Sequence, residues 1–150
     1  MVKIAAVVDS ACLIGLERIG QLDLLPTLIS PVMAPPAVEF EFGPVPPWMV
    51  VRAPADLGMV AALRLIVDAG ESEAIALAYE TRTRIILDDR KAREAAQRLG
   101  VPVTGTVGLL IKAKEMGIIA EIRPLLDALD ANQFRIGEAL RAEALRVAGE

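Results

Sequence analysis

The sequence contains no histidine, and its 150 residues include a single cysteine. Without histidine the chain cannot build a Ser-His-Asp or Cys-His catalytic unit, a histidine general base or a His-ligated zinc site. Cys12 alone cannot form an internal disulfide or a zinc site made of thiolates, and it agrees with a reducing compartment. Any chemistry must therefore rest on carboxylates, hydroxyls, lysine, arginine or a hard metal ion.

Aromatic residues and long apolar runs are also scarce. Phe, Trp and Tyr make up 3% of the chain, which offers little material for stacking on nucleic-acid bases. No apolar run reaches the roughly 18 to 20 residues of a membrane helix, and the N-terminus lacks the pattern of a secretory signal. The net charge of -4 argues against a broadly basic surface. We therefore expect a cytoplasmic protein that does not enter a membrane.

Hydrophobic residues are plentiful, at 54% of the chain, and they occur in short segments of two alternating kinds. Predicted strands cover residues 3–8, 32–33, 48–52, 84–87 and 101–103. Predicted helices cover residues 10–17, 22–29, 37–42, 56–67, 71–79, 90–99, 107–116, 121–129 and 134–147. This alternation predicts a single domain over residues 1–150, with a three-layer α/β/α fold and a mostly parallel, twisted sheet.

Acidic residues follow two of the predicted strands. Asp9 ends the first strand, while Asp88 and Asp89 end the strand at 84–87. Functional residues of such sheets gather at the carboxyl ends of strands. A structural interpretation is also open, because Asp9 and Asp89 could cap the helices that follow them. Side chains alternate along a strand, so one of the adjacent pair should enter a site while the other caps a helix, and we expect Asp89 to turn inward.

Carboxylates that converge need compensation. Two of them at about 5 Å repel by roughly 3 kcal/mol at an effective dielectric near 20. Such groups therefore stay apart, take up protons or hold a cation. Oxygen ligands without nitrogen or sulfur select Mg²⁺ or Mn²⁺, which favours hydrolysis of a phosphodiester. Arg90, Lys91 and Arg93 beside the Asp pair could hold substrate phosphates, although a solvated helix face is the plain alternative.

Four stretches resemble the PIN-domain nucleases, in particular their VapC-like branch and its predicted nucleic-acid-binding relatives. They are VVDSACLIGLERIGQLDLL, APPAVEFEF, DAGESEAIALA and ILDDRKAREAAQRLGVPVTGTVGLLIKAKEMGII, and in this order they cover nearly the whole chain. The resemblance implies a PIN-like fold, an RNA substrate, and ribonuclease activity that depends on Mg²⁺ or Mn²⁺.

The resemblance also implies which residues form the site. The acidic candidates are Asp9, Glu41, Glu71 and Asp89, with Asp88 as a further metal ligand and Glu73 and Glu39 as second choices. The third acid is commonly Asp in VapC-like nucleases, whereas GESEA offers two Glu, of which Glu71 fits the helical phase better. Ser10 and Thr106 are small polar positions that could hold metal-bound water or phosphate, or could simply cap helices.

A VapC-like protein is expected to be the toxin of a type II toxin-antitoxin pair. The resemblance thus implies a small DNA-binding antitoxin as partner and a homodimer. One alternative is an inactive PIN-like module that binds nucleic acid or protein. Another is a phosphoaspartate fold of the receiver or phosphatase kind, which VVDSAC disfavours because it offers neither an acidic pair nor Asp-x-Asp.

Overall fold

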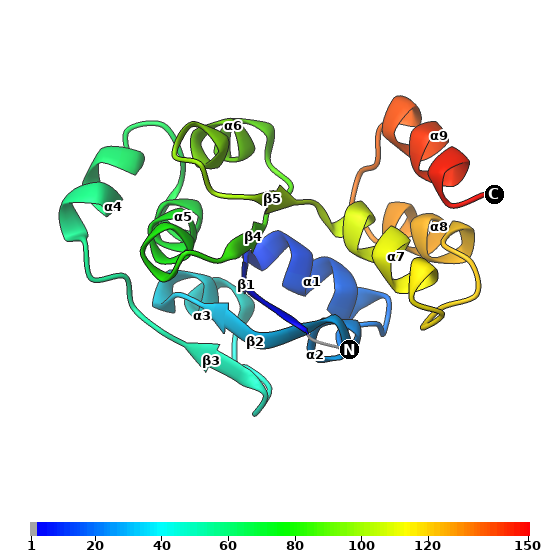
Figure 1. Ribbon diagram of the computed structural model, residues 1–150, viewed down its shortest axis with the longest axis horizontal. Coiled ribbons are helices and arrows are strands. Elements are labelled where there is room, and N and C mark those ends of the chain that lie inside the picture. Colours follow the sequence, from blue (N-terminus) through cyan, green and yellow to red (C-terminus); the bar gives the residue numbers. More distant parts are fainter. Residues whose placement is uncertain (1–2) are drawn as a thin grey trace.

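The computed structural model describes residues 3–150 and shows a parallel sheet surrounded by helices (Figure 1). Its strands are β1 (Ile4–Val8), β2 (Ile29–Ala34), β3 (Met49–Val51), β4 (Arg84–Ile86) and β5 (Val103–Thr104). They form one five-stranded sheet in the order β3-β2-β1-β4-β5, and every pairing is parallel. The predicted α/β fold with a mostly parallel sheet is confirmed.

The central strand β1 places the first acid of the sequence inside the molecule. Val7 pairs with Met33 of β2 on one side and with Ile85 of β4 on the other. Ala6 to Val8 are at most 1% exposed, as a strand with neighbours at both edges and helices over both faces requires. From the central strand β1 the chain first adds β2 and β3 on one side of the sheet, and later adds β4 and β5 on the other side. The strand order therefore reverses at β1, and Asp9 lies at this switch point.

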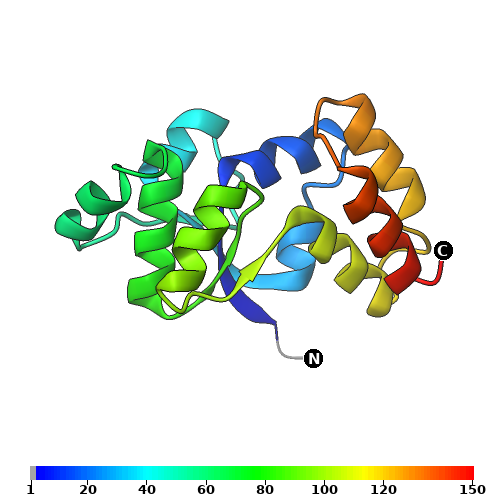
Figure 2. The same cartoon turned by 90° about the horizontal axis from the view of Figure 1, so that it is seen from above.

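Nine helices lie in the described part of the chain, on both sides of the strands (Figure 2). They are α1 (Ser10–Arg18), α2 (Leu24–Leu28), α3 (Pro36–Phe42), α4 (Leu57–Leu63), α5 (Ala69–Thr81), α6 (Arg90–Arg98), α7 (Thr106–Glu115), α8 (Arg123–Ala131) and α9 (Glu138–Val147). α5 packs against β1 and β4, and α6 packs against β5. Within residues 3–150, no helix has the length and apolarity needed to cross a membrane.

Two predicted helices end earlier than expected. The helix predicted over 22–29 stops at Leu28, because Ile29 is buried by pairing with β1 and begins β2. The helix predicted over 56–67 stops at Leu63, and Leu65 and Ile66 lie in the turn before α5 with 86% and 55% of their surface exposed. Their apolar spacing is compatible with a helix, but nothing covers them.

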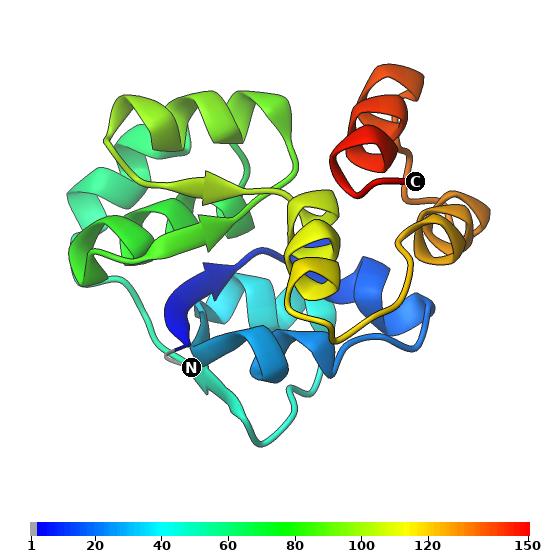
Figure 3. The same cartoon turned by 45° about the vertical axis from the view of Figure 1, so that its right-hand side comes forward.

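The C-terminal helices α7, α8 and α9 form a group beside β5 (Figures 1 and 3). α9 begins at Glu138, later than the predicted start, and packs against α7. Glu150 fixes the end of the chain, because its side chain accepts hydrogen bonds from the backbone N–H groups of Ile122 at 2.7 Å and Arg123 at 3.0 Å. These bonds hold the pKa of Glu150 down, at about 2.

Candidate functional site

Asp9 is the most deeply buried acid at the carboxyl edge of the sheet, with 5% of its surface exposed. It takes the position before α1, yet its side chain makes no capping hydrogen bond. Its Oδ1 atom is buried without a hydrogen-bond partner, and no other buried side-chain atom in residues 3–150 shares that state. A buried polar atom without a partner destabilises a fold, so the capping interpretation does not account for Asp9.

Three further carboxylates act on Asp9 through their charge, and they come from two other parts of the fold. Glu41 belongs to α3, Asp68 directly precedes α5, and Glu71 lies in the first turn of α5. Burial raises the pKa of Asp9 from 3.8 to about 7, and the charges of Glu71, Asp68 and Glu41 add to this rise. The backbone N–H of Ser10 acts in the opposite direction. The fold therefore gathers acids from distant segments into one electronegative place.

The Glu41 carboxylate lies directly against the backbone of Gly70. A Cβ atom added to Gly70 would stand 2.1 Å from Glu41 Oε1 and 3.7 Å from Asp68 Oδ1, so Glu41 would have to move. Glycine at the start of α5 thus allows the acid of α3 to approach. Burial raises the pKa of Glu41, Asp68 raises it further, and the hydroxyl of Ser10 lowers it.

Asp68 and Glu71 form a capping box at the start of α5. Asp68 Oδ1 accepts a hydrogen bond from the Glu71 N–H at 2.8 Å, and Glu71 Oε1 accepts one from the Asp68 N–H at 3.2 Å. Burial raises the pKa of Glu71, as do the charges of Asp68 and Asp89. Asp68 is absent from the predicted acids. Its Asp-x-x-Glu spacing to Glu71 signals a capping box, but not a place beside Asp9.

The adjacent aspartates after β4 point in different directions, as strand alternation requires. Asp89 caps α6, since its Oδ2 accepts a hydrogen bond from the Ala92 N–H at 3.0 Å, and its charge acts on Glu71. Asp88 turns to α7, where its two oxygens accept hydrogen bonds from the Thr106 N–H at 2.8 Å and the Thr106 hydroxyl at 2.6 Å. Asp89 therefore takes the capping role, and its side chain is exposed, so the structure does not show it turned inward as expected.

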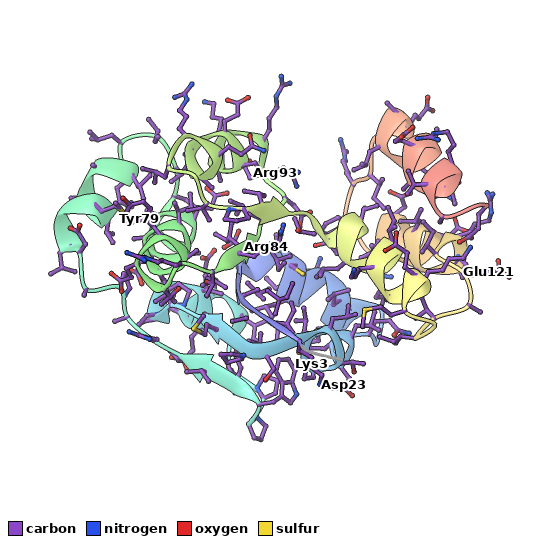
Figure 4. All side chains as sticks on the ribbon, viewed as in Figure 1. Lys3, Asp23, Tyr79, Arg84, Arg93 and Glu121 are labelled. Carbon is purple, nitrogen blue, oxygen red and sulfur yellow. The ribbon has the colours of Figure 1, made fainter. Side chains whose placement is uncertain are left out.

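Asp88, Thr106 and Arg93 make a tight contact between β4, α6 and α7. Burial raises the pKa of Asp88, while the bonds from Thr106 and the charge of Arg93 lower it. Arg93, at the β5 side of α6 (Figure 4), donates a hydrogen bond to the carbonyl of Leu87 at 3.0 Å. A Cβ on Gly105 would lie 2.8 Å from Arg93 Nη1 and 3.1 Å from Asp88 Oδ1, so a larger residue there would displace the end of the Arg93 side chain.

The second-choice acids, Glu73 of α5 and Glu39 of α3, are not among the carboxylates that raise the pKa of Asp9. Glu73 accepts a hydrogen bond from the Ala37 N–H at 3.1 Å and so joins α5 to the start of α3. Glu39 lies in the first turn of α3 and is partly buried. Ser10, the predicted small polar residue beside Asp9, is buried with 8% of its surface exposed.

The predicted phosphate-binding cations differ in whether their side chains already interact with other groups of the protein. Arg93 is engaged with Leu87, as described above. The side chain of Arg90 is 93% exposed and forms an ion pair with Glu94 at 3.5 Å. Lys91 is exposed on α6 and forms no ion pair with any residue in the range 3–150. Arg90 and Lys91 directly follow Asp89 in the sequence, at the start of α6.

Comparison with protein families identifies the family of the chain. A family model described as PIN domain (DUF3368) matches residues 5–150. The chain belongs to the PIN-domain family. The resemblance noted in the sequence is thereby confirmed. Searches of curated proteins and of solved structures gave no match.

PIN domains are generally nucleases and typically depend on a metal. The fit of such an ion to this chain depends on the spacing and the free oxygens of its acids. Among residues 3–150, no three Asp, Glu or Cys side chains stand close enough to form a ready-made metal site. Glu71 and Asp89 direct oxygens at the N–H groups of helix starts instead. The donors are nevertheless all oxygens, and Asp9 offers an unpartnered one, which suits Mg²⁺ or Mn²⁺. The kinds of donor therefore suit such an ion, while Glu71 and Asp89 are held at helix starts in this structure.

Proposed function

We propose that this PIN domain is an endoribonuclease that depends on Mg²⁺ or Mn²⁺ and has Asp9 at its centre. The observation that carries the proposal is the buried, unpartnered oxygen of Asp9 beside the carboxylates of Glu41, Asp68 and Glu71. A divalent cation bound here would satisfy that oxygen and compensate the repulsion that raises the pKa of Asp9.

Each acid has a role in this proposal. Asp9, Glu41, Glu71 and Asp89 hold the ion, and Asp68 lies next to them as the cap of α5. When bound, such an ion supplies hydroxide from water and stabilises negative charge during displacement at phosphorus. Arg90 and Lys91, directly after Asp89, contact the phosphates on either side of the cut.

A catalytically inactive PIN module that binds nucleic acid or protein is the second candidate. The observation that favours it is the engagement of Glu71 and Asp89 with helix starts, because these caps stabilise the fold without any metal. The two candidates differ in their response to metal, which the experiment below measures.

The proposal extends to the protein's setting in the cell. The VapC-like sequence stretches support a toxin of a type II toxin-antitoxin pair, neutralised by a small DNA-binding antitoxin, cytoplasmic and homodimeric. The support for these partners is the sequence resemblance alone, and co-expression with the product of a neighbouring gene would test it.

Thermal melting with and without Mn²⁺ tests the metal site. For wild type, millimolar Mn²⁺ should raise the melting temperature by roughly 5–10 °C, the effect of a ligand present at about 100 times its Kd. Asp9→Asn should lose this response and cleave RNA on the order of 100-fold more slowly. Glu17→Gln removes an acid from the far end of α1 and should behave as wild type.

Three results separate the candidates. A metal-dependent melt together with cleavage supports the nuclease. A wild-type melt indifferent to Mn²⁺ overturns it and leaves the inactive module. A metal-dependent melt without cleavage of single-stranded or structured RNA would support the site but contradict ribonuclease activity.

A further inference from the structure

Phe40 is the most exposed large hydrophobic residue in residues 3–150, with 91% of its surface accessible. The other two phenylalanines, Phe42 and Phe134, are partly buried and pack against the core. Phe40 lies on α3 between Glu39 and Glu41, and a residue on the apolar side of a short helix would normally be covered. One exposed apolar side chain is common on protein surfaces, so exposure alone assigns no role to Phe40.

The position of Phe40 beside the acids is more informative. It lines a hollow of about 350 Å³ that continues into the candidate site, because the acids Glu41 and Asp68 line the same hollow. The rest of the lining is small, formed by Ala37, Ala69 and Gly70. An aromatic ring therefore shares an open space with two carboxylates, Glu41 and Asp68, whose charges raise the pKa of Asp9.

We propose that Phe40 stacks against a base of the RNA strand next to the phosphate that is cut. This inference rests on the proposed nuclease function and adds a contact that positions the substrate. An aromatic face accepts any base, so one exposed ring is enough for one stacking contact. Phe40 directly precedes Glu41, so a base on its ring would lie beside a phosphate held at the acids.

The lining of the hollow favours bases with an amino group. The Glu41 and Asp68 carboxylates are hydrogen-bond acceptors, and adenine, cytosine and guanine carry amino groups that can donate to them. Uracil has no amino group, and its single N–H donor lies between two carbonyl oxygens that the carboxylates repel. We therefore expect adenine, cytosine or guanine to be preferred over uracil at the position stacked on Phe40.

A second copy of the chain fits the hollow less well than a base does. In a two-fold symmetric dimer each surface patch faces its own counterpart. Glu39, Glu41 and Asp68 around Phe40 would then meet the same acids of the partner, and like charges across an interface are strongly unfavourable. A base carries no net charge, and the charge of the phosphate next to it would be compensated by the metal ion of the proposed function.

Binding of short RNA strands to Phe40→Ala and Phe40→Trp tests the inference. Ca²⁺ would replace Mg²⁺, so that affinity is measured by fluorescence anisotropy without turnover. Phe40→Ala should weaken binding roughly ten-fold, the usual loss for one stacked base, and Phe40→Trp should retain it. Tyr79 lies near the C-terminal end of α5, on the side of α4 (Figure 4), and 46% of its surface is exposed. The control variant Tyr79→Ala should bind RNA as wild type does.

Strands with one base removed make the test specific for stacking. The abasic position is moved along the strand, and each protein's affinity is compared with its own affinity for the complete strand. At one position wild type should lose about ten-fold in affinity, whereas Phe40→Ala should lose nothing further. Equal losses for both proteins at every position would overturn the stacking contact. A dimer of wild type that Phe40→Ala converts to a monomer, seen by light scattering, would also overturn it and make Phe40 a subunit contact.

The same samples distinguish this inference from the proposed function. A wild type that cleaves RNA and responds to Mn²⁺, but binds RNA equally well with and without the Phe40 ring, overturns the stacking contact alone. A wild type that neither responds to Mn²⁺ nor binds RNA overturns both.

Discussion

Asp9 and Asp88 follow two neighbouring strands of the sheet, β1 and β4, yet the fold treats them differently. Both are largely buried, and burial raises the pKa of each. Asp88 has both oxygens engaged by Thr106, whereas Asp9 keeps an oxygen without a partner and has other acids around it. A buried aspartate at this edge can thus be satisfied by the protein, and Asp9 is not. Position at a strand end is common to both, so the partners of each carboxylate decide its role.

The two environments also differ in which helix starts they face. Asp88 accepts from the first N–H of α7 and so works as its cap, although α7 begins 18 residues later in the sequence. Asp9 lies beside the starts of α1 and α5 but caps neither. Positive helix ends favour negative charge. They ease the burial of Asp9 without giving its Oδ1 a partner.

The largest effect on stability is expected from Asp88→Ala. This change leaves the N–H and hydroxyl of Thr106 buried without an acceptor, and Thr106 has no exposed surface. Losing these two bonds and the interaction with Arg93 should destabilise the fold by on the order of 3–5 kcal/mol, with or without metal. Chemical denaturation in EDTA would measure it.

Asp9→Asn is the matched comparison for Asp88→Ala. No hydrogen bond to Oδ1 is lost, and one charge is removed from the acidic group. Without metal and at neutral pH this variant should be as stable as wild type or more stable. A loss of more than about 2 kcal/mol would contradict the distinction drawn between the two aspartates.

The second effect in size is a dependence of stability on pH in the absence of metal. Asp9 has a pKa of about 7 when folded and 3.8 when unfolded, so between these values the folded chain binds more protons. Its contribution is fully present below pH 3.8 and is lost as the pH rises through 7. Between pH 5 and pH 7 the free energy of unfolding should therefore fall by about 2 kcal/mol on account of Asp9.

Urea titrations of wild type and Asp9→Asn in EDTA at several pH values would measure this fall. The raised pKa values of Glu41, Glu71 and Asp88 act in the same direction, so a smaller slope should remain in the variant. Identical slopes for both proteins would show that Asp9 titrates normally.

The sequence predicted the central strands well because β1 and β4 are largely buried and therefore read as short apolar runs. Val7 and Ile85 illustrate this, since both are completely buried and both were expected in strands. The helix ends were predicted less well. Leu65 and Ile66 continue the apolar spacing of α4 but are exposed, and sequence spacing cannot show what lies opposite a residue.

The candidate site shows a similar limit. Asp9 follows a buried strand, and a topological rule placed it at the correct edge. Asp68 could not be assigned in this way, because its nearness to Asp9 depends on how α5 crosses the sheet and on Gly70 accepting Glu41. The direction of the Asp89 side chain likewise depends on the orientation of α6. Side-chain hydrogen bonds of this kind follow from packing between elements that are far apart in the sequence.

The smallest effect on stability, and the sharpest on metal binding, is expected from Gly70→Ala. Alanine favours the helix over glycine by up to about 1 kcal/mol, so the fold should change by less than that. The new Cβ would displace the Glu41 carboxylate, which lies within 2.1 Å of its position, and Mn²⁺ should then bind roughly ten-fold more weakly. Gly58→Ala is the control, because Gly58 is likewise the second residue of its helix and its added Cβ would meet only Asp56, at 3.4 Å. If Mn²⁺ raised the melting temperature of Gly70→Ala as much as that of Gly58→Ala, Glu41 would not belong to the metal site, and the acids around Asp9 would have to work without α3.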